Sequence, residues 1–238
     1  VSRAVRTPSR LEDDLTQILQ VAGPGTFGPG VTAVTTLPNP DLESEDLIAY
    51  EMGYRQQISK DISLDVAAFY NDYKDYVDFG FLTPTAGVFP VSYINAGDAQ
   101  SYGIEVAAEW NALKNLQFSA TYSYLDLNVH IENEGGFDLD TEEGLSPEHQ
   151  ASLRATWHVN DDVSVNPSVY YVSELPASNV DDYVRLDVNI GWKINDNMKF
   201  NVIGQNLLDN KHREFGPATG LNTAEIERSI FGKMTWEF

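Results

Sequence analysis

The sequence predicts an all-β protein whose antiparallel strands run up and down in chain order. The first reason is a period of two, because apolar and polar side chains alternate through most of the 238 residues and helical spacing is nearly absent. The second reason is that short and long connections alternate along the chain. The third is that charged residues within the segments avoid the apolar phase. Together these observations favour an antiparallel up-and-down transmembrane β-barrel.

About ten segments carry the strand pattern. In the fourth, Ile104, Val106 and Ala108 share one phase, whereas Glu105 and Glu109 lie on the other. Such alternation turns one face of a strand to an apolar environment and the other to water. In chain order, the predicted strands are residues 1–6, 46–58, 61–79, 92–111, 115–130, 147–159, 162–174, 181–194, 197–208 and 226–238.

The connections between these strands sort by length. The short ones are residues 59–61, 112–115, 160–162 and 195–197, which are rich in turn-forming Asn, Asp and Ser. The long ones are roughly residues 7–45, 80–92, 132–146, 175–181 and 209–225. An outer-membrane barrel has tight turns on its periplasmic rim and long loops outside. By this parity the last strand descends, which places Phe238 at the periplasmic rim.

The charged and aromatic side chains occupy the phases that a bilayer requires. A basic residue on the lipid face at the membrane midplane costs about 2–4 kcal/mol. The charges within the strands lie on the polar phase: Asp65, Glu105, Glu109, Arg154, Arg185, Asp187, Lys193, Lys199 and Lys233. Aromatic residues on the apolar phase are typical of interfacial girdles: Tyr50, Tyr54, Tyr70, Trp110, Tyr122, Tyr124, Trp157, Tyr171, Trp192 and Trp236. A half-buried soluble β-sheet, which also alternates, remains the simpler alternative.

Composition narrows the function classes. The chain has 15 Lys and Arg residues against 36 Asp and Glu residues, so its formal net charge is −21 and nucleic acid is disfavoured as a partner. The absence of cysteine excludes disulfides and thiolate chemistry within the chain. No run approaches the ~18 apolar residues of a membrane helix. The first residues lack a targeting signal and an initiator Met, which favours a portion of a longer polypeptide.

Several motifs together resemble one family, the TonB-dependent receptors. The first strand ends in a similar Arg-x-Pro corner, Arg6-Thr7-Pro8, and the last ends in Met-Thr-Trp-Glu-Phe, which resembles the C-terminal signature of outer-membrane barrels. The other motifs are residues 39–45 followed by 50–55, residues 95–97 with 101–106, residues 146–150, and residues 204–209 with His212 and 214–216. The chain departs from the family in having no plug, no energy-coupling box and room for under half the strands.

The resemblance implies that residues 1–238 are a partial β-barrel domain, about ten C-terminal strands of a larger, 22-stranded, plugged barrel in the outer membrane of a Gram-negative bacterium. It implies active transport rather than catalysis, with outer-membrane lipid, a TonB energy-transducing complex acting through the missing plug, and a small extracellular ligand as partners. An iron–siderophore complex is the default ligand, with oligosaccharide or cobalamin as alternatives. A self-contained barrel serving as pore, adhesin or surface hydrolase remains a competing interpretation.

The residues themselves predict no catalytic, metal or cofactor site. His130, His149, His158 and His212 lie in different segments, with His158 pointing into the lumen near a rim. The acidic stretch 132–143 is expected to be a solvated external loop, since it lacks the spacing of a calcium loop. Four charged residues point to the lumen by phase: Arg6, Glu105, Arg154 and Arg185. They are expected either to form ion pairs across strands or with a plug, or to contact an anionic solute.

Two short motifs resemble the paired boxes of haem receptors. They are Asn-Pro-Asp-Leu at residues 39–42 and Val-Arg-Thr-Pro at residues 5–8. Both depart from those boxes, and no His stands between them. Barrel geometry is therefore the preferred explanation of both motifs, ahead of haem ligation.

Overall fold

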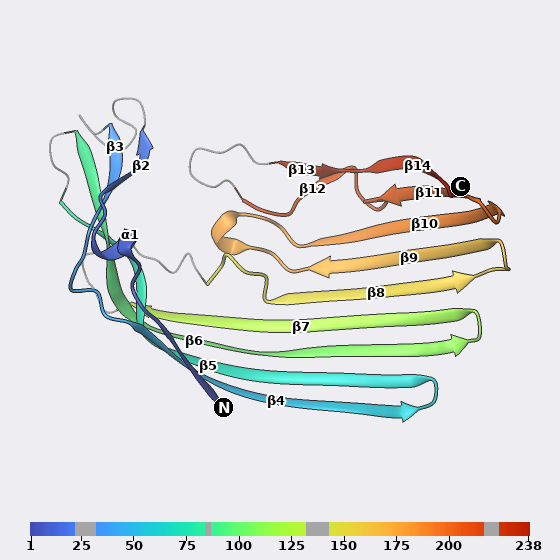
Figure 1. Cartoon of the computed structure of the whole chain (residues 1–238), viewed down its shortest axis with the longest axis horizontal. Helices are drawn as coiled ribbons and strands as arrows, with labels where there is room; N and C mark the ends of the chain where they lie inside the picture. The colour runs from blue at the N-terminus through green and yellow to red at the C-terminus, as the bar shows by residue number, and fades with distance from the viewer. Residues whose placement is uncertain (22–31, 84–86, 132–142, 217–223) are drawn as a thin grey trace. The chain divides into compact units, whose positions relative to one another are not determined.

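The computed structural model (Figure 1) describes residues 1–21, 32–83, 87–131, 143–216 and 224–238. Within them, one sheet has hydrogen-bonded neighbours in the order β1-β4-β5-β6-β7-β8-β9-β10-β11-β14, so the predicted succession of ten strands is confirmed. The bounds are β1 Ser2–Arg6, β4 Glu45–Ser59, β5 Ile62–Phe81, β6 Val88–Leu113, β7 Leu116–Ile131, β8 His149–His158, β9 Val163–Val172, β10 Tyr183–Asn195, β11 Met198–Gln205 and β14 Ser229–Trp236.

The chain divides into two compact units. The first comprises Val1–Glu51, Phe69–Tyr102 and Leu127–Glu143, and the second comprises Met52–Ala68, Gly103–Asp126 and Gly144–Phe238. The second unit holds the four tight turns, which join β4 to β5, β6 to β7, β8 to β9 and β10 to β11 at one end of the strands (Figure 1). Trp236 is opposed to Met198 beside the last of these turns, so the C-terminal strand ends at the rim that the loop parity predicted.

Sequence-adjacent strands pair antiparallel in the second unit, and their register confirms the alternation. Trp192 is opposed to Val163 on one side and to Phe200 on the other, so apolar residues of three strands share one face. Leu153 in the middle of β8 is 50% exposed, and Trp192 is 52% exposed. These residues are exposed in a single layer of strands and are not enclosed between two stacked sheets, which is the arrangement expected of a lipid-facing surface.

The long predicted connection 7–45 contains regular structure that the alternation of the sequence does not predict. It holds the short helix α1 (Arg10–Asp13), β2 (Gln17–Val21) and β3 (Ala33–Leu37). β3 pairs antiparallel with β2 and parallel with the start of β6, where Ala33 is opposed to Val88 and Leu37 to Ser92. Polar Thr35 and Thr36 are buried in β3, and such residues give no apolar alternation to recognise.

Three other predicted loops also contain regular structure. β5 ends at Phe81 and β6 begins at Val88, so most of the predicted connection 80–92 belongs to strands. Predicted loop 209–225 contains β12 (Lys211–Arg213), which pairs with β13 (Glu225–Glu227), and loop 175–181 contains the 3-10 turn η1 (Pro176–Ser178). Three-residue strands are too short to show a period. No helix among the described residues has the length and apolar character to cross a membrane.

Candidate functional site

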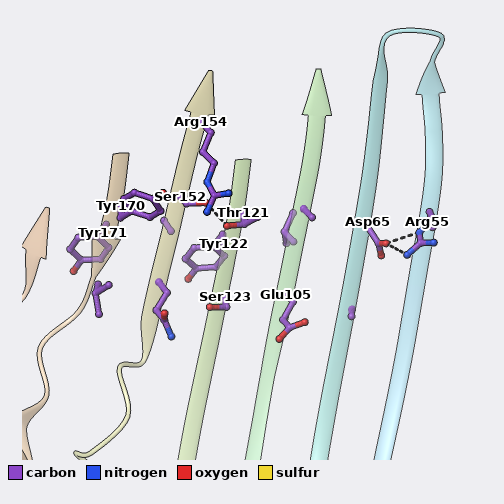
Figure 2. Close-up of a pocket in the computed structure, with 16 residues that line it drawn as sticks. Arg55, Asp65, Glu105, Thr121, Tyr122, Ser123, Ser152, Arg154, Tyr170 and Tyr171 are labelled. Carbon is purple, nitrogen blue, oxygen red and sulfur yellow. Dashed lines mark hydrogen bonds and ion pairs between the residues drawn. The ribbon is translucent and has the colours of Figure 1, made fainter. Parts of the chain in front are cut away.

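A pocket of about 680 Å³ lies on the polar face of the second unit, bordered by β4 to β9 (Figure 2). Directly opposed residues of antiparallel strands point to the same face. Two neighbouring polar rows therefore cross β7 to β10: Thr121, Ser152, Tyr170 and Arg185 in one, and Ser119, Arg154, Ser168 and Asp187 in the other. The pocket takes Thr121, Ser152, Arg154 and Tyr170 from these polar rows, and apolar-phase residues such as Tyr122 and Tyr171 also line it.

Arg154 is the cation of this pocket that has no acidic partner among the described residues. Its side chain is exposed, and its guanidinium carbon lies 5.5 Å from the centre of the Tyr170 ring. On the same ring, the guanidinium carbon of Arg185 lies 5.8 Å from the centre. A guanidinium over an aromatic face keeps its N–H donors directed outward, so Arg154 is placed to receive an anionic group.

The other charged residues at the pocket differ in whether an opposite charge pairs with them. Arg55 donates from Nε to Asp65 at 2.6 Å, so these two charges neutralise each other (Figure 2). Glu105 lines the pocket from β6 and makes no ion pair within the described part of the chain. The pocket therefore offers one free guanidinium and one free carboxylate, together with hydroxyl groups of Thr121 and Ser152. This chemistry fits a polar ligand that carries both an anionic group and hydrogen-bond donors.

Arg185, by contrast, is held by the protein itself. Its Nη2 and Nε donate to Asp187 at 2.7 and 3.0 Å, and its Nη1 reaches Glu214 at 3.4 Å. Glu214 also contacts His212 Nε2 at 3.1 Å, and the His212 ring stacks on Tyr183 with centroids 4.3 Å apart. Arg185 therefore joins the pocket face to the β12 side of the last long connection and acts as a positioning residue.

The structure gives the remaining candidates mostly structural roles. Arg6 forms an ion pair with the buried carboxylate of Glu12. Asn39 of the motif 39–42 donates from Nδ2 to the Tyr93 carbonyl at 2.9 Å and accepts from the Asp41 N–H, which supports the geometric explanation of that motif. In the same region, the Asn95 side chain accepts from the Glu43 N–H through Oδ1 and donates to the Glu43 carbonyl through Nδ2.

The histidines lie apart. His130 lies in β7, and His149 in β8 bonds the Tyr122 hydroxyl through Nδ1 at 2.9 Å. His158 borders a smaller pocket beside the β8–β9 turn, as its predicted place near a rim requires. Within the described residues, no three His, Asp or Glu side chains come close enough to hold a metal ion. Of the acidic stretch 132–143, only Glu143 is described, and it accepts from the Val129 N–H at 2.7 Å.

A protein-family model for the TonB dependent receptor-like β-barrel matches residues 1–207. This chain belongs to the TonB-dependent receptor β-barrel family. The resemblance found in the sequence motifs is confirmed, and with it the placement of this receptor barrel in the bacterial outer membrane. The family is one of transport receptors.

Curated relatives of this receptor barrel are longer proteins. It is 23% identical over 197 residues to an iron-regulated outer membrane virulence protein of Vibrio cholerae, covering 75% of this chain and 30% of the relative. It is 25% identical over 227 residues to the pesticin receptor of Yersinia pestis, covering 88% and 31%. The chain thus spans about 30% of the length of these relatives.

Solved structures show the same fold. The siderophore receptor PirA from Acinetobacter baumannii matches with a TM-score of 0.68 and 16% identity, covering 99% of this chain and 38% of that one. A mutant of the ferric enterobactin receptor PfeA from Pseudomonas aeruginosa matches with a TM-score of 0.66 and 16% identity, covering 99% and 37%. At this identity the likeness shows the barrel architecture alone.

Proposed function

We propose that residues 1–238 form the C-terminal part of the barrel of a receptor that takes up an iron–siderophore complex. The family membership supports a receptor, and the names of relatives and structural neighbours refer to iron regulation and siderophores. The observation that carries the proposal is Arg154, a lumen-facing guanidinium without an acidic partner among the described residues, placed over Tyr170 in a pocket of about 680 Å³.

The free guanidinium matters because the chain as a whole is strongly acidic. With a net charge of −21, the average field repels an anionic chelate, so binding depends on local donors. Arg154 supplies charge-assisted hydrogen bonds to carboxylate or catecholate oxygens, and Ser152 and Thr121 add hydroxyl groups beside it. Glu105 accepts hydrogen bonds from amide or hydroxyl donors of the same ligand.

Transport in this proposal is non-enzymatic. A plug in the part of the polypeptide outside residues 1–238 closes the lumen, and the TonB system supplies the force that moves it. The polar face built by β7 to β10 then forms one wall of the pathway. Deleting the TonB system is expected to abolish uptake of the ligand by cells while leaving its binding to the outer membrane intact.

The binding test uses the full-length receptor in a strain without other receptors for the probes. The probes are a ferric tricatecholate and ferric citrate labelled with radioactive iron, together with cobalamin and a maltooligosaccharide. Arg154→Gln is expected to weaken binding of the accepted ferric complex about tenfold to a hundredfold, because a hydrogen bond to a charged group contributes about 1.5–3 kcal/mol. Arg154→Lys keeps the charge without the planar fork and is expected to lie between.

Lys60→Gln is the matched control, since Lys60 is an exposed cation in the tight turn between β4 and β5. Binding of ferric probes that is equal in Arg154→Gln, Lys60→Gln and wild type removes Arg154 from the site. Uptake of cobalamin or oligosaccharide in place of either iron complex overturns the proposed ligand class.

A further inference from the structure

A second large pocket lies at the end of β10 opposite its tight turn, on the side that the loop parity assigns to the outside of the cell. Its volume is about 630 Å³, and the connection before β10 and the connection after β11 supply most of its walls. Sites for small molecules commonly have volumes of about 300–1,000 Å³. The lining residues all belong to the second unit and are not shared with the pocket around Arg154. The pocket therefore has the size of a separate ligand site.

Carboxylates outnumber cations in this second pocket. Its lining holds four carboxylates against two cations, namely Asp181, Asp182, Asp209 and Glu225 against Lys211 and Arg213. Lys211 Nζ lies 2.5 Å from Glu225 Oε2, so these two charges neutralise each other. Asp209 Oδ1 accepts only from the neighbouring Asn210 N–H, at 2.6 Å. The lining therefore keeps an excess of negative charge.

Asp181 and Asp182 carry most of that excess. Both are exposed, and neither carboxylate has a hydrogen bond or ion pair within the described part of the chain. All 15 Lys and Arg residues of the sequence fall within the described ranges, and none of them comes within 4.0 Å of either carboxylate. A cation that neutralises these two aspartates must therefore come from outside residues 1–238.

The same pocket also contains a buried hydrogen-bond acceptor without a donor. The His212 side chain lines the pocket and is 7% exposed. Its Nε2 meets Glu214 Oε1 at 3.1 Å, and because this carboxylate also accepts from Arg185 it acts as an acceptor, so Nε2 carries the proton. In a neutral imidazole the other nitrogen then accepts. His212 Nδ1 is buried and has no hydrogen-bond partner among the described residues, so it lacks an N–H or O–H donor.

We propose that this pocket, defined by Asp181, Asp182, Asp209 and His212, binds a small organic polyamine from the external medium. Ammonium groups of the ligand pair with the aspartates, and one of its N–H groups donates to His212 Nδ1. A metal ion suits the site less well, since no three His, Asp or Glu side chains of the described residues converge closely enough to hold one. A simple inorganic cation also donates no hydrogen bond to Nδ1.

The test is isothermal titration calorimetry of spermidine into the full-length receptor purified in detergent. We expect saturable binding at one site in the wild type. Asp181→Asn/Asp182→Asn should weaken that binding about tenfold or more, because charge-assisted hydrogen bonds to the ammonium groups are lost. His212→Phe keeps a ring to stack on Tyr183 but removes the acceptor, and it should weaken binding by about fivefold to tenfold.

Asp161→Asn/Asp162→Asn is the matched control. These two aspartates are also adjacent and exposed, but they lie in the tight turn between β8 and β9, at the other end of the strands. The control removes the same charge from an acidic chain, so it measures attraction of spermidine by the general field. It should bind spermidine as the wild type does, and calcium chloride titrated in place of spermidine should bind more weakly.

The proposal is overturned if spermidine shows no saturable binding, or if either site variant binds it as tightly as the control variant. Tighter binding of calcium than of spermidine also overturns it, because the carboxylates would then serve a metal ion. Circular dichroism of each purified variant checks that the barrel is folded. Because the readout is amine binding and not iron uptake, this proposal and the transport proposal fail separately.

Discussion

Glu12 is a carboxylate that the fold buries and yet keeps ionised. Burial alone would raise the pKa of its carboxyl, but hydrogen bonds from the Ser9 N–H and hydroxyl, together with the Arg6 guanidinium, outweigh burial and lower that pKa. A carboxyl with a lowered pKa in the folded state contributes stability above its ordinary pKa, near 4.3. That contribution is lost as the pH falls through the lower, folded-state pKa.

Replacing Glu12 by Gln is therefore expected to loosen α1 and the end of β1 at neutral pH and to have little effect in strong acid. The measurement is hydrogen–deuterium exchange of the amides of residues 6–14 in the detergent-solubilised receptor, at pH 7 and below pH 4. Asp14→Asn is the control, because exposed Asp14 makes only a 3.4 Å contact with Arg10. Equal protection of wild type and Glu12→Gln at pH 7 would contradict this account.

Asn206 joins the pocket face to the hairpin of β12 and β13. The residue is fully buried and adopts a left-handed backbone conformation with φ of 53°. Its N–H donates to Asp187 Oδ1 at 2.9 Å, and its Nδ2 donates to the Ile226 carbonyl at 3.0 Å. Asn tolerates this conformation better than other residues with a Cβ, so backbone and side-chain requirements coincide at this position.

Asn206→Ala is expected to lower the free energy of unfolding by about 1–3 kcal/mol, through the lost hydrogen bond and the strain of Ala at positive φ. Asn206→Gly removes the strain and should cost less. Urea unfolding of the barrel in detergent micelles measures both, with Asn210→Ala as an exposed control. If Asn206→Gly is as unstable as Asn206→Ala, backbone strain contributes nothing.

At the scale of elements, the period of two predicted strands wherever one face meets lipid. β8 illustrates this, because Leu153 and Trp157 are exposed on one face while Ser152 and Arg154 lie on the other. β3 was missed for the opposite reason, since its buried Thr36 satisfies its hydroxyl on the Gln17 backbone and not by apolar contact.

A direct test of the two faces places the same charge on each side of β8. Leu153→Arg puts a guanidinium in the lipid near the middle of the strand and should cost about 2–4 kcal/mol. Thr156→Arg, on the polar face, should cost far less. Unfolding of both variants in lipid vesicles measures the difference, and equal stabilities would contradict the assignment of the faces.

For the whole molecule, the sequence predicted the candidate site only in part. Phase alone placed Glu105, Arg154 and Arg185 on the lumen side, but the free and the paired arginine look alike in the sequence. The distinction depends on Glu214, which is 29 residues from Arg185 along the chain and reaches it through the fold of a long connection. Phe231 shows the same limit, because its place on the polar face follows from the strand register and not from its chemistry.

The whole chain should also behave as a membrane protein in solution. Most long strands of the second unit present exposed apolar side chains on one face, including Leu153, Trp192 and Trp236. A net charge of −21 does not offset this surface, because charges on the other face leave the apolar face bare to water. We therefore expect the expressed 238-residue chain to aggregate in plain buffer and to disperse in detergent, as measured by light scattering and analytical ultracentrifugation. A monodisperse, β-structured chain in detergent-free buffer would show that these faces meet one another and not lipid.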